Sequence, residues 1–318
     1  MPHSAEAYFL AGRDAPWWAV GLSLFSSNIG SEHLVGLAGS GAKVGLCVSW
    51  GEWLSPLCIL LLGWVFVPFF LRTRVFTMPE FLERRFSRSL RIYYAVVSLA
   101  MYVMTKVSVA LFAGAVVLNL TVGWSFWTGA TALVLATGAY TTLGGMKAVI
   151  YTEVLQAGVL IAGGVCLLTL ACWAVGGPAA LWRQLPDEQV HLVQPVTHSE
   201  FPWTGVVLGM PLTSIWYWCT DQSIVQRVLA AKSIAHARAG CVLAGYLKLL
   251  PPLLFVIPGM AARVLFGAEL ETSAEGFNSA LPLLVTRLLP TPVLGLMVAG
   301  MLAALMSSLA SVFNSAST

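Results

Sequence analysis

The sequence predicts an all-α, multi-pass bundle of membrane helices. Of its 318 residues, 58% are hydrophobic and only 10% are charged, and the mean hydropathy is +0.82. A soluble domain, whose surface must face water, is far less apolar than this. The net charge of +3 is small and the basic residues lie in short loops, so the composition does not indicate a nucleic-acid partner.

The apolar residues form segments long enough to cross a lipid bilayer. The apolar core of a bilayer is about 30 Å thick and needs ~20 helical residues. No soluble domain fits between these segments. The expected spans, numbered in chain order, are 17–39, 45–71, 92–120, 124–143, 148–176, 203–227, 239–265 and 292–318.

The connections between spans alternate in charge, and this pattern sets the orientation. Acidic residues mark 177–202 and 266–280 as external segments. We expect the basic connections in the cytoplasm, and these contain Arg72, Arg74, Arg84, Arg85, Arg88 and Arg91 after span two, Lys147 after span four, and Arg227, Lys232 and Arg238 after span six.

Neither end of the sequence has the pattern of a natural boundary. The start lacks the charged region and apolar core of a signal peptide, and span eight is still apolar where the sequence stops. We expect the sequence to be incomplete at both ends. The six cysteines lie in or beside apolar runs without metal-site spacing, so we expect buried free thiols.

Several ionisable side chains fall inside the spans, where facing lipid would cost several kcal/mol each. Glu52 and Lys248 lie deep in apolar runs, which favours a cavity or a charged partner. Lys106 is expected to reach the membrane interface with its long side chain, and this interpretation is also open for Glu153 and Asp221.

Two spans have the composition of interrupted helices. Span one crowds Ser26, Ser27, Asn28, Gly30 and Ser31 together, and span six carries SIWYWCTDQ at 214–222. Glycine and small hydroxylic residues let the backbone leave the helix. Unwound backbone at membrane depth lines a cavity or is buried, and its carbonyls can bind Na⁺. Interruptions five spans apart predict two inverted five-helix repeats, although either one alone is also explained by helix packing.

Span eight offers oxygen atoms on one helical face. Ala304, Ser307 and Ser308 follow the i, i+3, i+4 spacing, and a hard cation binds several oxygens. We therefore predict a cation site between this face and the interruption in span one. The alternative is simple packing of small residues between helices.

A long, ordered series of motifs runs from about Tyr8 to the last residue. The motifs are SLFSSNIGSEHLVGLAGSG (23–41), EW (52–53), GGMKAVIYTEVLQ (144–156), WYWCTDQSIVQRVLAAK (216–232), GYLK (245–248), PGM (258–260) and LMSSLASVFNSAS (305–317). Together they resemble the sodium/solute symporter family, in particular its sugar branch, the sodium/glucose cotransporters. The resemblance implies a LeuT-like fold of inverted repeats, with 1–318 as one membrane domain, 17–176 as the first repeat, and 203–318 as three helices of the second.

The resemblance also implies the site residues. The sodium site would use Ser26, Ile29, Ala304, Ser307 and Ser308. A second ion position, known in some members, would lie near Ser311 and Glu153, where many members carry aspartate. Tyr217 would be an inner gate beneath the sugar, Glu52 and Lys248 would neutralise each other, and Asp221 and Gln222 would support the unwound backbone. The implied sugar contacts are Asn28, Glu32, His33, Glu52, Ser55, Ser214, Tyr217, Trp218 and Lys248.

The function that the resemblance implies is sugar import, for example of glucose or galactose, across the plasma membrane. Na⁺ would be the coupling ion, with no enzymatic cofactor. An enzyme is not indicated, because no nucleophile–base set or metal-ligand spacing occurs. Three alternatives stay open: another solute, a sugar-gated conductor or sensor, and an inactive fragment. The other solutes are myo-inositol, another polyol, a monocarboxylate, an amino acid or a vitamin, although carboxylates at Glu32 and Glu52 would repel the acids.

Overall fold

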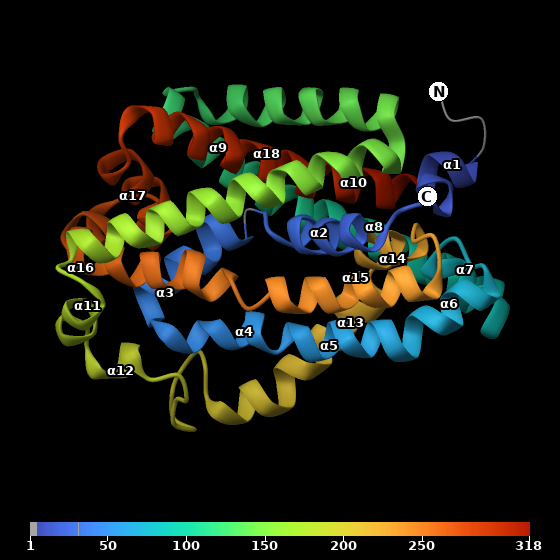
Figure 1. Cartoon of the computed structure of the whole chain (residues 1–318), viewed down its shortest axis with the longest axis horizontal. Helices are drawn as coiled ribbons and strands as arrows, with labels where there is room; N and C mark the ends of the chain where they lie inside the picture. The colour runs from blue at the N-terminus through green and yellow to red at the C-terminus, as the bar shows by residue number, and fades with distance from the viewer. Residues whose placement is uncertain (1–4, 31) are drawn as a thin grey trace.

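The computed structural model describes residues 5–30 and 32–318, apart from the side chains of Glu32, Leu120 and Thr121. This part of the chain folds into helices joined mostly by short turns, with a longer loop at 191–202 (Figure 1). The elements of its first half are α1 (Ala5–Phe9), η1 (Ala11–Arg13), α2 (Trp17–Asn28), η2 (Glu32–Leu37), α3 (Ala38–Val44), η3 (Leu46–Ser49), α4 (Trp50–Trp53), α5 (Ser55–Leu61), η4 (Leu62–Phe66), α6 (Val67–Thr73), α7 (Met78–Arg85), α8 (Arg88–Met101), η5 (Tyr102–Val107), α9 (Ser108–Val122) and α10 (Phe126–Ala174).

The second half continues the bundle and ends in one long helix, α18, beside α10 (Figure 1). Its elements are α11 (Pro178–Gln184), α12 (Asp187–Val190), η6 (Gly205–Gly209), α13 (Met210–Thr220), α14 (Gln222–Leu229), α15 (Ile234–Leu247), η7 (Pro252–Val256), α16 (Ile257–Thr272), η8 (Gly276–Ser279), α17 (Ala280–Leu288) and α18 (Thr291–Ser317).

The helices long and apolar enough to cross a membrane account for six of the predicted spans. They are Leu46–Thr73, Arg88–Asn119, Phe126–Ala174, Ile234–Thr272 and Thr291–Ser317. Spans four and five both lie in α10, which reverses direction at Gly145 (Figure 1). Gly145 has φ +59°, a left-handed conformation that favours glycine. Spans one and six are missing from this set because their helices are interrupted.

Both predicted interruptions are present. Helix α2 ends at Asn28, Ile29 is extended with φ −84° and ψ 97°, and helix resumes in η2. Helix α13 ends before Asp221, which has φ −67° and ψ 127°. The Asp221 carboxylate then caps α14, because its Oδ1 accepts the backbone N–H of Ser223 at 2.9 Å.

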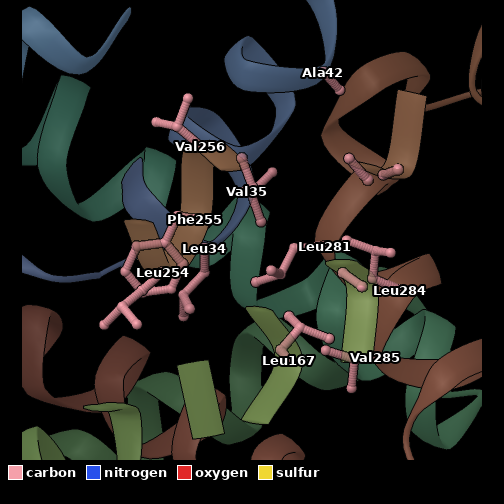
Figure 2. Close-up of a cluster of buried hydrophobic side chains, with 14 of the residues drawn as sticks. Leu34, Val35, Ala42, Leu167, Leu254, Phe255, Val256, Leu281, Leu284 and Val285 are labelled. Atoms are coloured by element: carbon pink, nitrogen blue, oxygen red, sulfur yellow. The ribbon is translucent and has the colours of Figure 1, made fainter. Parts of the chain in front are cut away.

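Equivalent spans of the two predicted repeats lie against one another. Helix α2 contacts α14, α5 contacts α15, and α9 contacts α18, while α10 packs along both α2 and α18. A buried apolar cluster holds the segment that follows the first interruption (Figure 2). Around Leu34 and Val35, Figure 2 shows Ala42, Leu167, Leu254, Phe255, Val256, Leu281, Leu284 and Val285.

The outer surface of the bundle carries large apolar side chains. Trp127 is 77% exposed, Met104 76% and Leu155 74%. In water, so much exposed apolar surface would be costly, whereas lipid tails solvate it. The exterior therefore agrees with the predicted multi-pass membrane bundle.

Two predictions about charged residues are wrong. Lys106 does not reach the membrane interface, because its Nζ donates to Asp221 Oδ2 at 2.9 Å and Ser223 Oγ at 3.1 Å. Arg227 is not in a loop: it lies in α14, only 1% exposed, and is paired with the fully buried Glu153. Lys106 and Arg227 are therefore balanced by carboxylates from distant segments and not by water at the membrane interface.

Candidate functional site

A cavity of about 690 Å³ opens between the two interrupted helices. Most of the predicted solute contacts line it, and these are Asn28, His33, Glu52, Ser55, Ser214, Tyr217 and Trp218. The side chain of Glu32, also predicted, lies outside the described residues. The prediction missed other lining residues, including Ser40, Gly51, Val109, Phe201, Met210, Thr213 and Trp216. Thr213 and Met210 lie four and seven residues before Tyr217 on α13, on the same helical face, so the helical period was the available signal for these two.

A hydrogen-bonded charge network forms one wall of this cavity. Lys248, fully buried at the end of α15, donates to Glu52 Oε2 and to Asn28 Oδ1. His33 Nε2 lies 3.0 Å from Glu52 Oε1. The predicted pairing of Glu52 with Lys248 is thus present, and it balances a carboxylate that would otherwise be costly in this environment.

Tyr217 forms the floor of the cavity. Its hydroxyl accepts a hydrogen bond from Asn28 Nδ2 at 3.0 Å, and its ring meets the Trp218 ring edge-on at 5.3 Å between centroids. On the other side, Lys106 Nζ lies 5.0 Å from the centre of the Tyr217 ring. Tyr217 and Asn28 also line a second, smaller cavity, so together they form the boundary between the two cavities.

The smaller cavity, of about 30 Å³, lies where α18 meets the interruption after α2. Ser27, Gly30, Ser308 and Ser311 are among its lining residues. A Cβ atom on Gly30 would lie 2.1 Å from Ser308 Oγ, so only glycine permits this close approach. The cavity is of a size that holds one small ion or water.

The hydroxyls of Ser308 and Ser26 are buried without a hydrogen-bond partner among the described residues. A buried hydroxyl without a partner is costly, and here it marks atoms that an ion could satisfy. Ile29 and Ala304, predicted to contribute carbonyls, are fully buried. Gly30, in the interruption after α2, and Ser308, on α18, are therefore in contact, and these are the two elements between which the cation site was predicted.

Ser307 points to a different group from Ser308. Its hydroxyl lies 3.3 Å from Glu153 Oε1, and the Ser311 hydroxyl lies 2.9 Å from the same oxygen. Arg227 and Ser23 complete the shell around this carboxylate. Sequence reasoning missed both residues; the one available signal for Arg227 was its place at the end of an expected span.

A second charged cluster, formed by Lys106 and Asp221, lies next to the Tyr217 ring. Asp221 Oδ1 accepts the Tyr102 hydroxyl at 3.2 Å, and Asp221 Oδ2 accepts Lys106. Gln222, predicted to support the unwound backbone, instead holds the turn before α7, because its Oε1 accepts the backbone N–H of Met78 at 3.0 Å. The cluster joins the interruption of span six to span three.

Comparison with known proteins shows the family to which the chain belongs. The model of the sodium:solute symporter family matches residues 8–318. The chain belongs to the sodium:solute symporter family. Its members are transporters and not enzymes, and Na⁺ is their coupling ion, as predicted.

Several curated members of the family are similar to this symporter-family chain. It is 44% identical over 98% of its length to sodium/glucose cotransporter 2 of Rattus norvegicus, and 41% identical over 98% to sodium/glucose cotransporter 1 of Oryctolagus cuniculus. The human sodium/myo-inositol cotransporter is 42% identical over 99% of it. The alignments cover 52%, 52% and 49% of these relatives, so the chain spans about half their length.

A solved symporter has the same fold. It is a Na⁺-coupled sialic acid symporter in a substrate-bound, outward-open state, with a TM-score of 0.90 and 23% sequence identity. The match covers 99% of this chain and 68% of that structure. The predicted LeuT-like fold is thereby confirmed.

Proposed function

We propose that this symporter-family protein imports an uncharged, polyhydroxylated solute, a sugar such as glucose or galactose, together with Na⁺ across the plasma membrane. The observation that carries the proposal is the pair of adjoining cavities, one of about 690 Å³ and one of about 30 Å³, that share Asn28 and Tyr217. In this proposal residues 1–318 act as one membrane domain, with repeats at 17–176 and 203–318.

The wall of the large cavity suits a sugar. Sugar hydroxyls both donate and accept hydrogen bonds, and Asn28, His33 and Glu52 offer both kinds of group beside the Trp218 ring. Small-molecule sites commonly have this volume and combine apolar surface with a few polar groups. Lys248 and His33 already pair with the Glu52 carboxylate, so an uncharged sugar can bind without having to balance that charge. For the same reason, repulsion by Glu52 alone does not exclude an acidic solute.

The small cavity suits Na⁺. Carbonyls from Ser26, Ile29 and Ala304 would join the Ser308 hydroxyl around the ion, with Ser307 as the further predicted ligand. These residues lie on α2, the turn that follows it, and α18, so the ion would hold the two helices together. Unwound backbone at membrane depth provides such sites in secondary transporters.

Asn28 offers a route for coupling between ion and solute. It is the last residue of α2, next to the proposed ion carbonyls, and it bonds both Lys248 and Tyr217 in the solute cavity. An ion that fixes the end of α2 therefore also fixes a solute contact. Each Na⁺ that crosses a 100 mV potential contributes ~2.3 kcal/mol, which corresponds to an accumulation of about 50-fold.

The same geometry supports alternating access. The large cavity extends to Phe201, in the segment expected outside the cell, whereas Tyr217 and the Lys106–Asp221 pair close the opposite side. In this proposal the protein opens outward here, and the inner gate opens when Tyr217 moves.

The test is uptake of radiolabelled glucose and galactose by cells that produce the full-length protein, in Na⁺ and in K⁺ medium. We expect saturable uptake only with Na⁺, and a loss of at least tenfold in Glu52→Gln, because a hydrogen bond to a charged group contributes about 1.5–3 kcal/mol. Glu188→Gln, at an exposed position, is the matched control. Equal uptake by Glu52→Gln and Glu188→Gln would refute the assigned solute cavity.

The second candidate solute is myo-inositol or another polyol. The 42% identity to a sodium/myo-inositol cotransporter favours it, and its ring of hydroxyls would use the same cavity groups. Competition of unlabelled glucose, galactose, myo-inositol and monocarboxylates against the labelled sugar separates these solutes. Sodium current without sugar accumulation would instead identify a conductor or sensor.

A further inference from the structure

A polar cavity of about 370 Å³ lies at the end of the bundle that holds α1, α6 and α14 (Figure 1). Its walls come from the segment before α2, the end of α6 and the start of α15. The last two of these segments carry basic residues that we expect in the cytoplasm. The cavity shares no lining residue with the two cavities of the proposed transport site.

Positive charge dominates this cavity. Its lining includes four cations and one carboxylate, an excess of three positive charges, and these residues are Arg13, Arg72, Arg74, Lys232 and Glu6. The carboxylate is already used, because Glu6 Oε1 accepts Arg13 Nε at 2.6 Å. Arg72, Arg74 and Lys232 form no ion pair or side-chain hydrogen bond with any residue that the structure describes. Like charges that face one cavity repel, so an anion between them would be stabilised.

The backbone holds the cations around the cavity. The N–H of Ala15 donates to the carbonyl of Ala230, and the N–H of Lys232 donates to the carbonyl of Ala15, both at 3.0 Å. These two bonds fix Lys232 beside the segment that contains Arg13. Arg13 and Arg74 also have left-handed backbone, with φ of +54° and +50°, which is unfavourable for a residue with a Cβ atom. The fold therefore brings these side chains together although their charges repel.

The donors around the cavity suit a phosphate group. Arginine forms paired hydrogen bonds with phosphate oxygens, and lysine adds a compact charge. Ser233 caps the start of α15, where its Oγ accepts the N–H of His236 at 3.3 Å and keeps its own proton to donate. The positive end of the α15 dipole adds to the same field. The volume is large enough for a small phosphorylated molecule.

We propose that this cavity binds a phosphate monoester, held by Arg72, Arg74 and Lys232. The phosphate group has the same chemistry in a soluble molecule and in a lipid headgroup, and the test separates these two sources. A bound anion would join the segment before α2 to the end of α6 and the start of α15. It would thus stabilise the ends of α2 and α15 that lie opposite to Asn28 and Lys248.

The first test is calorimetric titration of the purified full-length protein with inorganic phosphate and with glucose 6-phosphate. The medium contains K⁺ and chloride at constant ionic strength, without Na⁺ or transported solute. We expect both anions to bind, with a Kd weaker by about tenfold or more in Arg74→Gln/Lys232→Gln. Arg72→Gln should also weaken binding if the double variant does not fold.

The matched control is Arg85→Gln/Arg88→Gln. It removes the same charge from exposed positions that do not line the cavity, so we expect the natural Kd. An equal loss of affinity in the two double variants would show an effect of net charge alone and would overturn the proposal. Unchanged affinity in a folded Arg74→Gln/Lys232→Gln would overturn it as well.

The second test separates a soluble ligand from a lipid. Thermal unfolding is followed in phosphatidylcholine vesicles, with inorganic phosphate in the buffer or with phosphatidic acid in the membrane. A higher unfolding temperature with soluble phosphate supports a soluble ligand, and a rise only with phosphatidic acid supports a headgroup, provided that Arg74→Gln/Lys232→Gln loses the rise and the control keeps it. No binding and no rise from either source would overturn the proposal. Because Na⁺ and solute are absent, these outcomes are independent of the proposed transport function.

Discussion

Ser308→Ala tests the proposed sodium site with the least disturbance to the fold. The Ser308 hydroxyl has no hydrogen-bond partner among the described residues, so its removal breaks no bond in the sodium-free protein. We expect unchanged or slightly higher stability without Na⁺, since an unsatisfied buried group is removed. Ser307→Ala lacks this advantage, because it removes a contact with Glu153.

The expected cost appears when sodium binds. A polar contact to a charged partner contributes about 1.5–3 kcal/mol, so the Kd for Na⁺ should rise by about 10- to 150-fold. At a sodium concentration 100 times the natural Kd, binding stabilises the natural protein by ~2.7 kcal/mol. A variant with a Kd about 30-fold weaker gains only about 0.9 kcal/mol at that concentration.

The assay is thermal unfolding of the purified protein across a sodium titration, with K⁺ holding the ionic strength constant. Ser108→Ala, at an exposed position in α9, is the control and should match the natural protein. A folded Ser308→Ala protein whose Kd for Na⁺ stays within about twofold of the natural value would refute the assignment of this hydroxyl as a ligand.

Three further changes probe the neighbouring groups. Tyr217→Phe removes a 3.0 Å bond with Asn28, so we expect solute affinity about 3- to 10-fold weaker and a sodium leak current without solute. Lys248→Met removes the ammonium partner of Glu52 and leaves only His33 beside this carboxylate, so it should lower the free energy of unfolding by about 3–5 kcal/mol, as measured by denaturation, with most of the loss restored by adding Glu52→Gln. Gly30→Ala should abolish sodium-dependent stabilisation, because its Cβ would overlap the opposing serine hydroxyl.

Gly30→Ala has a matched control in Gly138→Ala. A Cβ atom at Gly138 would meet nothing within 4 Å, and this residue lies inside α10. The control should be neutral or more stable by up to ~1 kcal/mol, since alanine favours helix over glycine. Equal sodium responses of the two variants would contradict the close approach of Gly30 to Ser308.

The architecture could be predicted because it depends on local composition. Long apolar runs mark membrane helices whatever their neighbours are, and the crowded serine and glycine residues before Ser31 marked the place where α2 ends. The tight reversal at Gly145 was expected as a loop between two spans, and the helix continues on both sides of it. The observed ends of the helices differ from the predicted ends of the spans by only a few residues.

The electrostatic partners could not be predicted in the same way. Glu153 and Arg227 are 74 residues apart, and Lys106 and Asp221 are 115 apart. No local pattern in the sequence predicts that these residues form pairs. The cations near helix ends, Lys106 and Arg227, were therefore interpreted as groups that face water. The packing of α10 against α2 and α18 decides which carboxylate lies beside the buried cation.

By itself, the sequence determined that this protein is a membrane bundle with two interrupted helices and polar groups at their centre. Those properties follow from hydropathy and from the conformational freedom of glycine, which act over a few residues. The tertiary structure alone decided that Ser308 meets Gly30 while Ser307 turns to Glu153. The two adjacent hydroxyls point in different directions on the helix, and only the surrounding helices supply a different partner for each.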